Sequence, residues 1–181
     1  MNTIEITVTD NEKIIAQVFE TAGSNKILII AGAMGTKQTF YSKFAEFLMA
    51  KGITVITFDY SGIGKSLLQP ISKVKSNVQY WGNIELECVL QYVITNHPNK
   101  KVYVLGHSVG GQLIGLAPSA SAAAKIILVA AQSGYWKFWE GFSKYKMWAT
   151  WHILFPSLIK MFGYMPSKKI SGMEKPGGGH Q

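Results

Sequence analysis

The sequence predicts an α/β fold, in which a mostly parallel sheet carries helices on both faces and begins with an antiparallel hairpin. Short apolar runs of strand length occur at 26–30, 53–58, 102–105 and 126–129. Segments with helical spacing separate most of these runs, and strands that alternate with helices pair in parallel. Near the N-terminus apolar and polar residues alternate instead, which is typical of a hairpin.

The strands follow in order. Residues 4–9 and 13–19 have extended patterns, and a turn is expected between them at Asp10-Asn11. The continuous apolar run at 26–30 suits a strand that is buried on both faces. Because no strand pattern follows Val129, the strand at 126–129 is expected to form an edge of the sheet with an uncovered apolar face.

Three helices are expected between these strands. Apolar residues recur at helical spacing from Phe40 onward, and Gly52 ends this helix. A second helix is expected over 81–93, and a short third one over 112–116. The first domain, the sheet with its helices, is therefore assigned to residues 1–131.

The composition indicates a globular protein, with 48% hydrophobic and 15% charged residues. The net charge of +8 comes from scattered lysines, which favours a solvated surface over a nucleic-acid site. The single Cys88 lies in an apolar stretch and is interpreted as a buried, reduced cysteine in a cytoplasmic protein. No leader, membrane span, metal-ligand spacing or cofactor motif is recognised.

Residues 132–170 differ in composition from the core. Four tryptophans, at 136, 139, 148 and 151, alternate with lysines, and 135–162 is expected to form an amphipathic helix broken at Pro156. This segment is interpreted as the start of an aromatic cap or lid over an apolar pocket. A helix that lies in a membrane interface is the alternative. The remaining residues, 171–181, are expected to form a disordered, glycine-rich tail.

The chemistry is indicated by Gly106-His107-Ser108-Val109-Gly110, which matches G-x-S-x-G. An apolar strand precedes the motif and a helix-compatible segment follows it, which is the context that a nucleophilic serine needs. The serine occupies a strained turn between strand and helix, and the glycines allow the neighbouring backbone to come close. A serine that merely caps a helix after a glycine-rich turn is the alternative.

A second motif, Ala31-Gly32-Ala33-Met34-Gly35, follows the strand at 26–30. A backbone N–H of Ala33 or Met34 is expected to join that of Val109 in stabilising an oxyanion, although an ordinary glycine turn fits as well. By contrast, Gly64-Lys65-Ser66 is no phosphate-binding loop, because that motif needs glycine where this chain has Asp59.

Together, the segments 31–35, 58–66, 106–112 and 133–136 resemble predicted bacterial α/β-hydrolases of the serine-aminopeptidase-like and esterase-like groups. The resemblance implies the α/β-hydrolase fold, with Ser108 as nucleophile in an elbow formed with Gly106, His107 and Gly110. It also implies an oxyanion hole of Val109 with Ala33 or Met34. Two departures are visible: Ser61 stands where such proteins usually carry arginine, and Glu85 where they often carry aspartate.

The catalytic acid and histidine of this fold follow the serine in the chain. Downstream of Ser108 there is no aspartate, and the candidates are Glu140, Glu174, His152 and His180. None is in a context that suits the role, and His152 is predicted not to be catalytic. The chain is therefore expected to be truncated before its acid and histidine.

The function expected is that of a serine hydrolase that cleaves a small, rather apolar ester through an acyl-enzyme. The alternative is a non-catalytic binding or scaffold remnant, which contacts lipid or a partner through the tryptophan-rich segment. The sequence does not indicate an oligomeric state.

Overall fold

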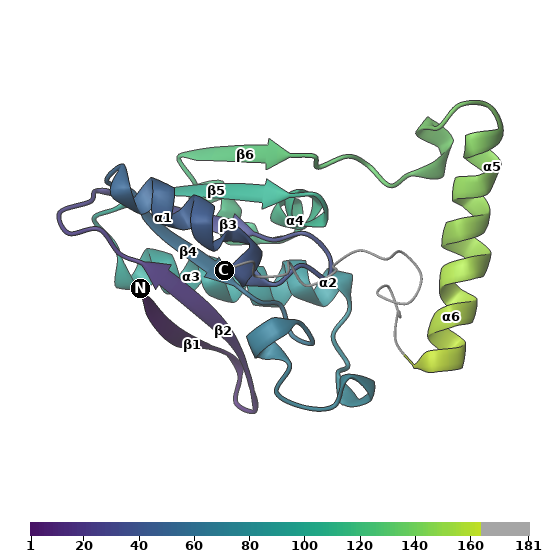
Figure 1. Ribbon diagram of the computed structural model, residues 1–181, viewed down its shortest axis with the longest axis horizontal. Coiled ribbons are helices and arrows are strands. Elements are labelled where there is room, and N and C mark those ends of the chain that lie inside the picture. Colours follow the sequence, from purple (N-terminus) through teal and green to yellow (C-terminus); the bar gives the residue numbers. More distant parts are fainter. Residues whose placement is uncertain (164–181) are drawn as a thin grey trace, which may run out of the picture. The chain divides into compact units, whose positions relative to one another are not determined.

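The computed structural model of the chain describes residues 1–163. It divides into two compact units, of which the first is Met1–Gln132 and the second begins at Ser133. The first unit contains a six-stranded sheet with the strand order β1-β2-β4-β3-β5-β6 (Figure 1). Its strands are β1 (Asn2–Thr9), β2 (Glu12–Phe19), β3 (Lys26–Ala31), β4 (Thr54–Phe58), β5 (Lys101–His107) and β6 (Lys125–Val129).

The strand directions confirm the predicted α/β sheet. β1 and β2 form an antiparallel hairpin, and β2 joins β4 in antiparallel orientation. The pairs β3–β4, β3–β5 and β5–β6 are parallel. The parallel strands end at one edge of the sheet, so the segments that follow β3, β4 and β5 lie at that edge, where open α/β sheets bind their ligands.

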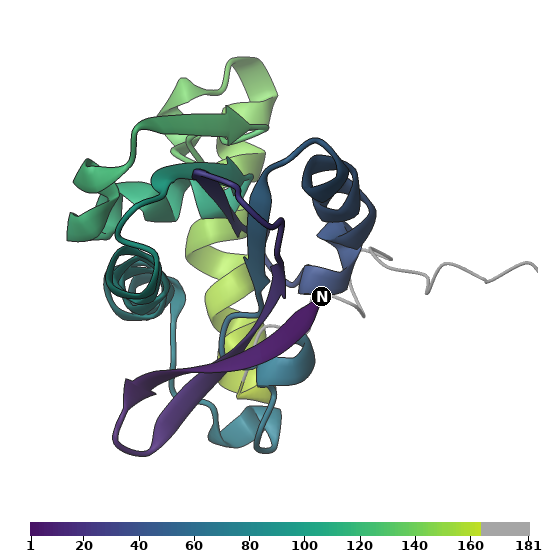
Figure 2. The same cartoon turned by 90° about the vertical axis from the view of Figure 1, so that its left-hand side faces the viewer.

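Helices cover both faces of the sheet. Figure 2 shows α1 (Ser42–Ala50) in blue on one side and α3 (Glu87–Asn96) in teal on the other. α3 continues a π-helical segment, η4 (Trp81–Leu86), so the helix predicted at 81–93 runs further than expected. The helix predicted at 112–116 begins earlier, as α4 (Val109–Leu113) and a 3-10 turn, η5 (Ile114–Leu116).

Shorter elements connect these parts. They are η1 (Gln38–Tyr41), η2 (Gly64–Ser66), η3 (Ile71–Lys73), α2 (Val78–Tyr80) and η6 (Pro118–Ala122). η1 leads directly into α1, and α2 leads into η4, so most of the connecting chain after β3 and β4 is helical.

The core consists of two apolar clusters, one on each face of the sheet. Ile27 and Ile29 of β3 pack into the larger cluster, which includes residues of η4, α3 and α4. Leu28 and Ile30 of the same strand pack with Tyr41 and α1 on the other face. β3 is thus buried on both faces, as predicted, and each such side chain contributes about 1.5–3 kcal/mol to folding.

β6 differs from the other parallel strands. It pairs with β5 and lies at the end of the strand order. All of its residues are exposed, although four of the five are Ile, Leu or Val. Among residues 1–163 it is therefore an edge strand with uncovered apolar side chains, as the sequence predicts.

The second unit is helical. It contains η7 (Trp136–Phe138), α5 (Gly141–Ala149), the π-helical segment η8 (Thr150–Leu154) and α6 (Phe155–Phe162). The break predicted at Pro156 is wrong, because Pro156 falls in the first turn of α6, where its missing N–H removes no bond within that helix. A π-helical turn lies immediately before it, so the helical run continues.

The aromatic side chains of this unit are largely exposed, with Phe142 at 83%. The ammonium groups of Lys137 and Lys144 lie 5.6 and 5.5 Å from the Trp136 ring. The cap assigned to 132–170 is described as far as residue 163, and the tail assigned to 171–181 lies outside the described residues. No helix within residues 1–163 is both long and apolar enough to cross a membrane.

Candidate active site

Ser108 stands in a sharp turn between β5, which ends at His107, and α4, which begins at Val109. Its backbone has φ 52° and ψ −120°. Within residues 1–163, Ser108 and Ala130 are the residues other than glycine with positive φ. Such a conformation is strained for a residue with a side chain, and it persists where the surroundings enforce it. The turn therefore has the backbone geometry expected of a nucleophile elbow.

Two glycines of the motif are required by close backbone approaches. A Cβ on Gly110 would lie 2.1 Å from the carbonyl oxygen of Ala31, at the end of β3. A Cβ on Gly106 would lie 2.4 Å from the Cα of Gly111, in α4. Any larger residue would push α4 away from β3 and β5, so these glycines set the tightness of the turn.

The backbone N–H groups of Ser108 and Val109 differ in their hydrogen bonding. The N–H of Ser108 donates to the carbonyl oxygen of Val129 in β6, at 2.9 Å. Val109 is the first residue of α4, so its N–H has no partner within the helix. That N–H is thus suited to bind an oxyanion formed at Ser108.

The turn with the second predicted donor lies beside the elbow. Ala31 of β3 is in register with Gly106 of β5, so the two strands end side by side. The N–H of Ala33 donates to the hydroxyl of Tyr41 at 2.8 Å. Met34 is exposed. The structure therefore brings Ala33, Met34 and the elbow to the same edge of the sheet, and it shows a partner for the N–H of Ala33.

The side chain of His107 lies against η1. Its Nδ1 lies 2.9 Å from the hydroxyl of Tyr41. Its ring also stacks on Phe40, with 6.4 Å between ring centroids and 13° between planes. Neither contact is visible in the sequence, where nothing in the spacing of Tyr41 distinguishes it from other aromatic residues.

The loop after β4 is organised by Asp59, for which the sequence pattern indicates no role of its own. Its carboxylate accepts hydrogen bonds from the N–H of Gln38 at 2.7 Å and of Lys65 at 2.8 Å. Ser66 donates to the carbonyl oxygen of Asp59 at 2.6 Å. The Gly64-Lys65-Ser66 run thus folds around a buried carboxylate, which is a structural role.

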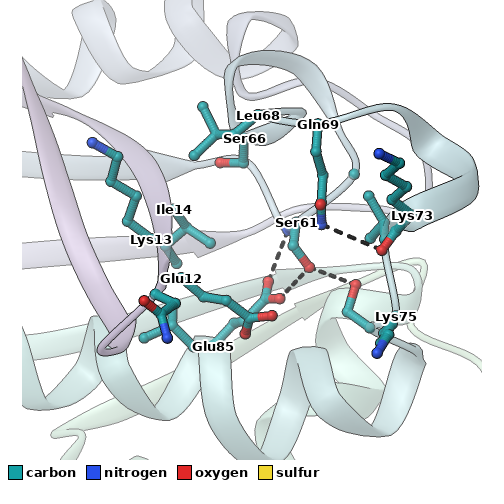
Figure 3. A pocket seen from close by; sticks show the side chains of 15 residues that line it. Glu12, Lys13, Ile14, Ser61, Ser66, Leu68, Gln69, Lys73, Lys75 and Glu85 are labelled. Atoms are coloured by element: carbon teal, nitrogen blue, oxygen red, sulfur yellow. Dashed lines mark hydrogen bonds between the residues drawn. The ribbon is translucent and has the colours of Figure 1, made fainter.

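The two departures from the family pattern contact each other. The carboxylate of Glu85 accepts hydrogen bonds from the Ser61 N–H, at 2.9 Å, and from the Ser61 hydroxyl (Figure 3). Glu85 is completely buried. Burial raises the pKa of Glu85, and the hydrogen bonds from Ser61 partly oppose this rise. Ser61 and Glu85 also line a cavity of about 420 Å³, but Ser108 does not.

The downstream acid and histidine candidates fall in the second unit or beyond. Glu140 precedes α5, and His152 lies in η8 with its ring 5.4 Å from that of Trp148. Glu174 and His180 lie outside the described residues. Within the first unit, no side chain forms a hydrogen bond with the Ser108 hydroxyl. Among residues 1–163, no group of three potential metal ligands gathers.

Cys88 is less buried than predicted. It is half-buried in α3 and packs at the margin of the larger core cluster, because α3 turns this side chain toward β1. Its Sγ lies 4.0 Å from the carbonyl oxygen of Val8. Burial raises the pKa of the Cys88 thiol, and nearby Glu87 and Glu85 raise it further. The thiol is therefore protonated at neutral pH, as in a structural cysteine.

A family model described as "Serine aminopeptidase, S33" matches residues 6–169. The chain belongs to this family. The match covers both the elbow and the turn after β3, so the S33 assignment and the geometry of Ser108 agree. The S33 family and the solved structures below are α/β-hydrolases, and the chain has the α/β-hydrolase fold.

Solved structures support the fold of this S33 family member. The α/β serine hydrolase XC6422 from Xanthomonas campestris, described as having no lid, superposes with a TM-score of 0.58 at 17% identity, covering 77% of this chain and 63% of that one. The α/β hydrolase GrgF from Penicillium sp. sh18 gives 0.61 at 18%, covering 91% and 56%. The Pyrococcus furiosus esterase Pf2001 gives 0.51 at 25%, covering 62% and 43%.

The chain therefore spans less than two thirds of the length of these structures. No curated protein matches the sequence.

Proposed function

We propose that the chain carries the nucleophile and the oxyanion donors of a serine hydrolase that cleaves a small, rather apolar ester through an acyl-enzyme. The strained backbone of Ser108, held between β5 and α4, is the observation that carries this proposal. A serine that only capped a helix would not need positive φ. It would also not need Gly106 and Gly110, positions at which a Cβ would clash with the neighbouring backbone.

In the proposed reaction the hydroxyl oxygen of Ser108 attacks the carbonyl carbon of the ester while a histidine takes the hydroxyl proton. The oxyanion accepts hydrogen bonds from the Val109 N–H and from the turn of Ala33 and Met34. Collapse of the intermediate releases the alcohol, which receives the proton from the histidine. Water then hydrolyses the acyl-enzyme by the same steps.

No acid or histidine of the first unit contacts the Ser108 hydroxyl. We place the catalytic acid and histidine in further polypeptide, of the kind that accounts for the rest of the length of XC6422 and GrgF. Without them, the oxyanion donors and substrate binding alone give about 10³-fold catalysis over water. We therefore expect residues 1–181 to react slowly.

The second unit is proposed to be a lid that covers an apolar substrate. Its support is the set of exposed aromatic side chains on η7 and α5, such as Phe138 and Phe142, because side chains of this kind line ligand pockets.

The nucleophile is tested with a fluorophosphonate probe, which phosphonylates activated serines. We expect slow labelling of Ser108, located by mass spectrometry of the labelled peptide. Ser108→Ala should abolish labelling, and His152→Ala should leave the rate unchanged. Labelling that survives in Ser108→Ala would reject Ser108 as nucleophile. Labelling that needs His152 would show a catalytic base within this chain.

A non-catalytic remnant that contacts lipid is the second candidate. The observation that favours it is the pairing of exposed aromatic rings with lysines, as at Trp136 with Lys137 and Lys144. Co-sedimentation with phosphatidylcholine vesicles that contain phosphatidylglycerol tests it. Binding by the chain, together with no labelling of Ser108, would favour this candidate over the hydrolase.

A further inference from the structure

Tyr41 is the residue that joins the two halves of the candidate site. It ends η1 and is almost completely buried. A Cβ on Gly32 would lie 3.1 Å from its ring, so the turn after β3 packs directly on it. Its hydroxyl contacts the backbone of Ala33 on one side and the side chain of His107 on the other.

One hydrogen bond of this hydroxyl has a fixed direction, and the direction of the other depends on the tautomer of His107. A hydroxyl has one proton to donate and two lone pairs with which it accepts. The N–H of Ala33 donates to Tyr41, so the Tyr41 proton is free to be donated to Nδ1 of His107. A His107 that accepts this proton is neutral and carries its own proton on Nε2.

The surroundings keep this hydroxyl protonated. Burial raises the pKa of Tyr41, and the hydrogen bond from the Ala33 N–H only partly offsets the rise. At neutral pH Tyr41 is therefore a neutral phenol that accepts a hydrogen bond from the Ala33 N–H and forms a second one with Nδ1 of His107. Both partners belong to the candidate site: Ala33 to the turn with the second oxyanion donor, and His107 to the elbow.

We propose that Tyr41 is a positioning residue of the hydrolase, whose hydroxyl fixes the turn of Ala33 and Met34 relative to the elbow of Ser108. This proposal rests on the proposed function. The two sets of oxyanion donors come from separate segments, α4 and the turn after β3. An oxyanion hole works only when its donors are held at fixed positions before the reaction, so a side chain that links the segments determines their spacing.

The opposite role makes the opposite prediction. If Tyr41 only occupied the Ala33 N–H and so competed with the oxyanion, its removal would free a donor and speed the reaction. If it positions the turn, its removal slows the reaction. Tyr41→Phe removes the hydroxyl, keeps the ring against Gly32 and therefore separates the two roles by the sign of the effect.

The experiment compares fluorophosphonate labelling rates of the full chain and its variants. Tyr41→Phe is expected to slow labelling of Ser108 about tenfold, which is the effect of one lost hydrogen bond on a rate. Tyr103→Phe, a tyrosine of β5 that packs with the same core cluster, is the matched control and should stay within about twofold of wild type. An unchanged or faster rate in Tyr41→Phe would overturn the proposal.

A second variant and a second measurement keep the result interpretable. His107→Leu removes the link from the other end and should also slow labelling, and the double variant should be no slower than the slower single variant. Additive losses in the double variant would overturn the link.

Hydrogen exchange of the Ala33 amide, followed by NMR in ¹⁵N-alanine-labelled protein, should accelerate in Tyr41→Phe, whereas exchange of the Ala45 amide, in the buried part of α1, should not change.

These measurements separate the inference from the function. Unaltered exchange at Ala33 in a folded Tyr41→Phe variant would overturn the link whatever the labelling. If no variant is labelled but Ala33 exchange accelerates, the proposed function fails, and the positioning role fails with it, while the hydrogen-bonded link is confirmed.

Discussion

Strands β3 and β6 have nearly the same sequence and opposite surroundings. β3 is Lys-Ile-Leu-Ile-Ile-Ala and β6 is Lys-Ile-Ile-Leu-Val. Ile27 and Ile29 of β3 are fully buried, whereas Ile126 and Ile127 of β6 are 46% and 44% exposed. Both strands belong to one sheet, and β3 lies between β4 and β5 while β6 lies at the end. An apolar run therefore determines that a segment forms a strand, and its position in the sheet determines how far it is buried.

A large loss of stability is expected where the end of β3 meets the turn of Ser108. Gly110→Ala places a methyl group 2.1 Å from the Ala31 carbonyl oxygen, so the free energy of unfolding should fall by about 3 kcal/mol. Gly115→Ala, where the methyl group meets no atom within 4 Å, is the matched control and should cost nothing. Urea denaturation measures both. A stable Gly110→Ala protein would contradict the close packing at β3.

Truncation of equivalent isoleucines tests the comparison of the two strands directly. Ile29→Ala should cost about 2–5 kcal/mol, because it leaves a cavity in the core. Ile127→Ala should cost about 0.5 kcal/mol or less, because the side chain is 44% exposed. Equal losses in urea denaturation would mean that β6 is covered in solution.

The exposed face of β6 should also cause self-association. Leu128 is 58% exposed, and an uncovered apolar edge strand is a site at which chains pair. Leu128→Lys should lower the fraction of associated chain in sedimentation velocity without lowering stability, because a charge opposes edge pairing. A wild-type chain that sediments as a monomer at all concentrations would contradict self-association through β6.

The smallest effect is expected at Glu85, the buried carboxylate beside Ser61. Its pKa is raised in the folded protein. The folded state therefore binds the proton more tightly than the unfolded one, so the stabilisation is complete at low pH and is lost as pH rises through the folded-state pKa. Melting temperatures should fall over that range in wild type and stay level in Glu85→Gln. Parallel curves for the two proteins would assign the pH dependence to another group.

Local patterns predicted much of the fold, together with the backbone turn of the candidate site. The elbow is specified within five residues, because its glycines and its serine are all needed by a single turn. The strands and most helices are predicted by the periodicity of the apolar residues, because this periodicity shows which face of each segment is buried. The passage of the helix through Pro156 was not predictable in this way, since it depends on a π-helical turn that leaves no sequence signal.

Contacts between distant residues were the part that the sequence did not reveal. Tyr41 and His107 are 66 residues apart, and Ser61 and Glu85 are 24 apart. Ser61 and Glu85 each depart from the family pattern in the sequence. Only the fold shows that the Glu85 carboxylate accepts a hydrogen bond from the Ser61 hydroxyl. The residue type determines which hydrogen bonds a side chain can form, and the fold determines which residue it contacts.

The bond between the Ser108 N–H and the Val129 carbonyl oxygen has a consequence for how this fold can be divided. The amide of Ser108 is held by the last residue of β6, an edge strand, so the support of the turn comes from a segment about twenty residues further along the chain. A fragment that stopped after α4 would keep the whole motif and lose this anchor. Residues 1–129 are therefore the shortest N-terminal piece in which Ser108 retains every backbone contact of its turn.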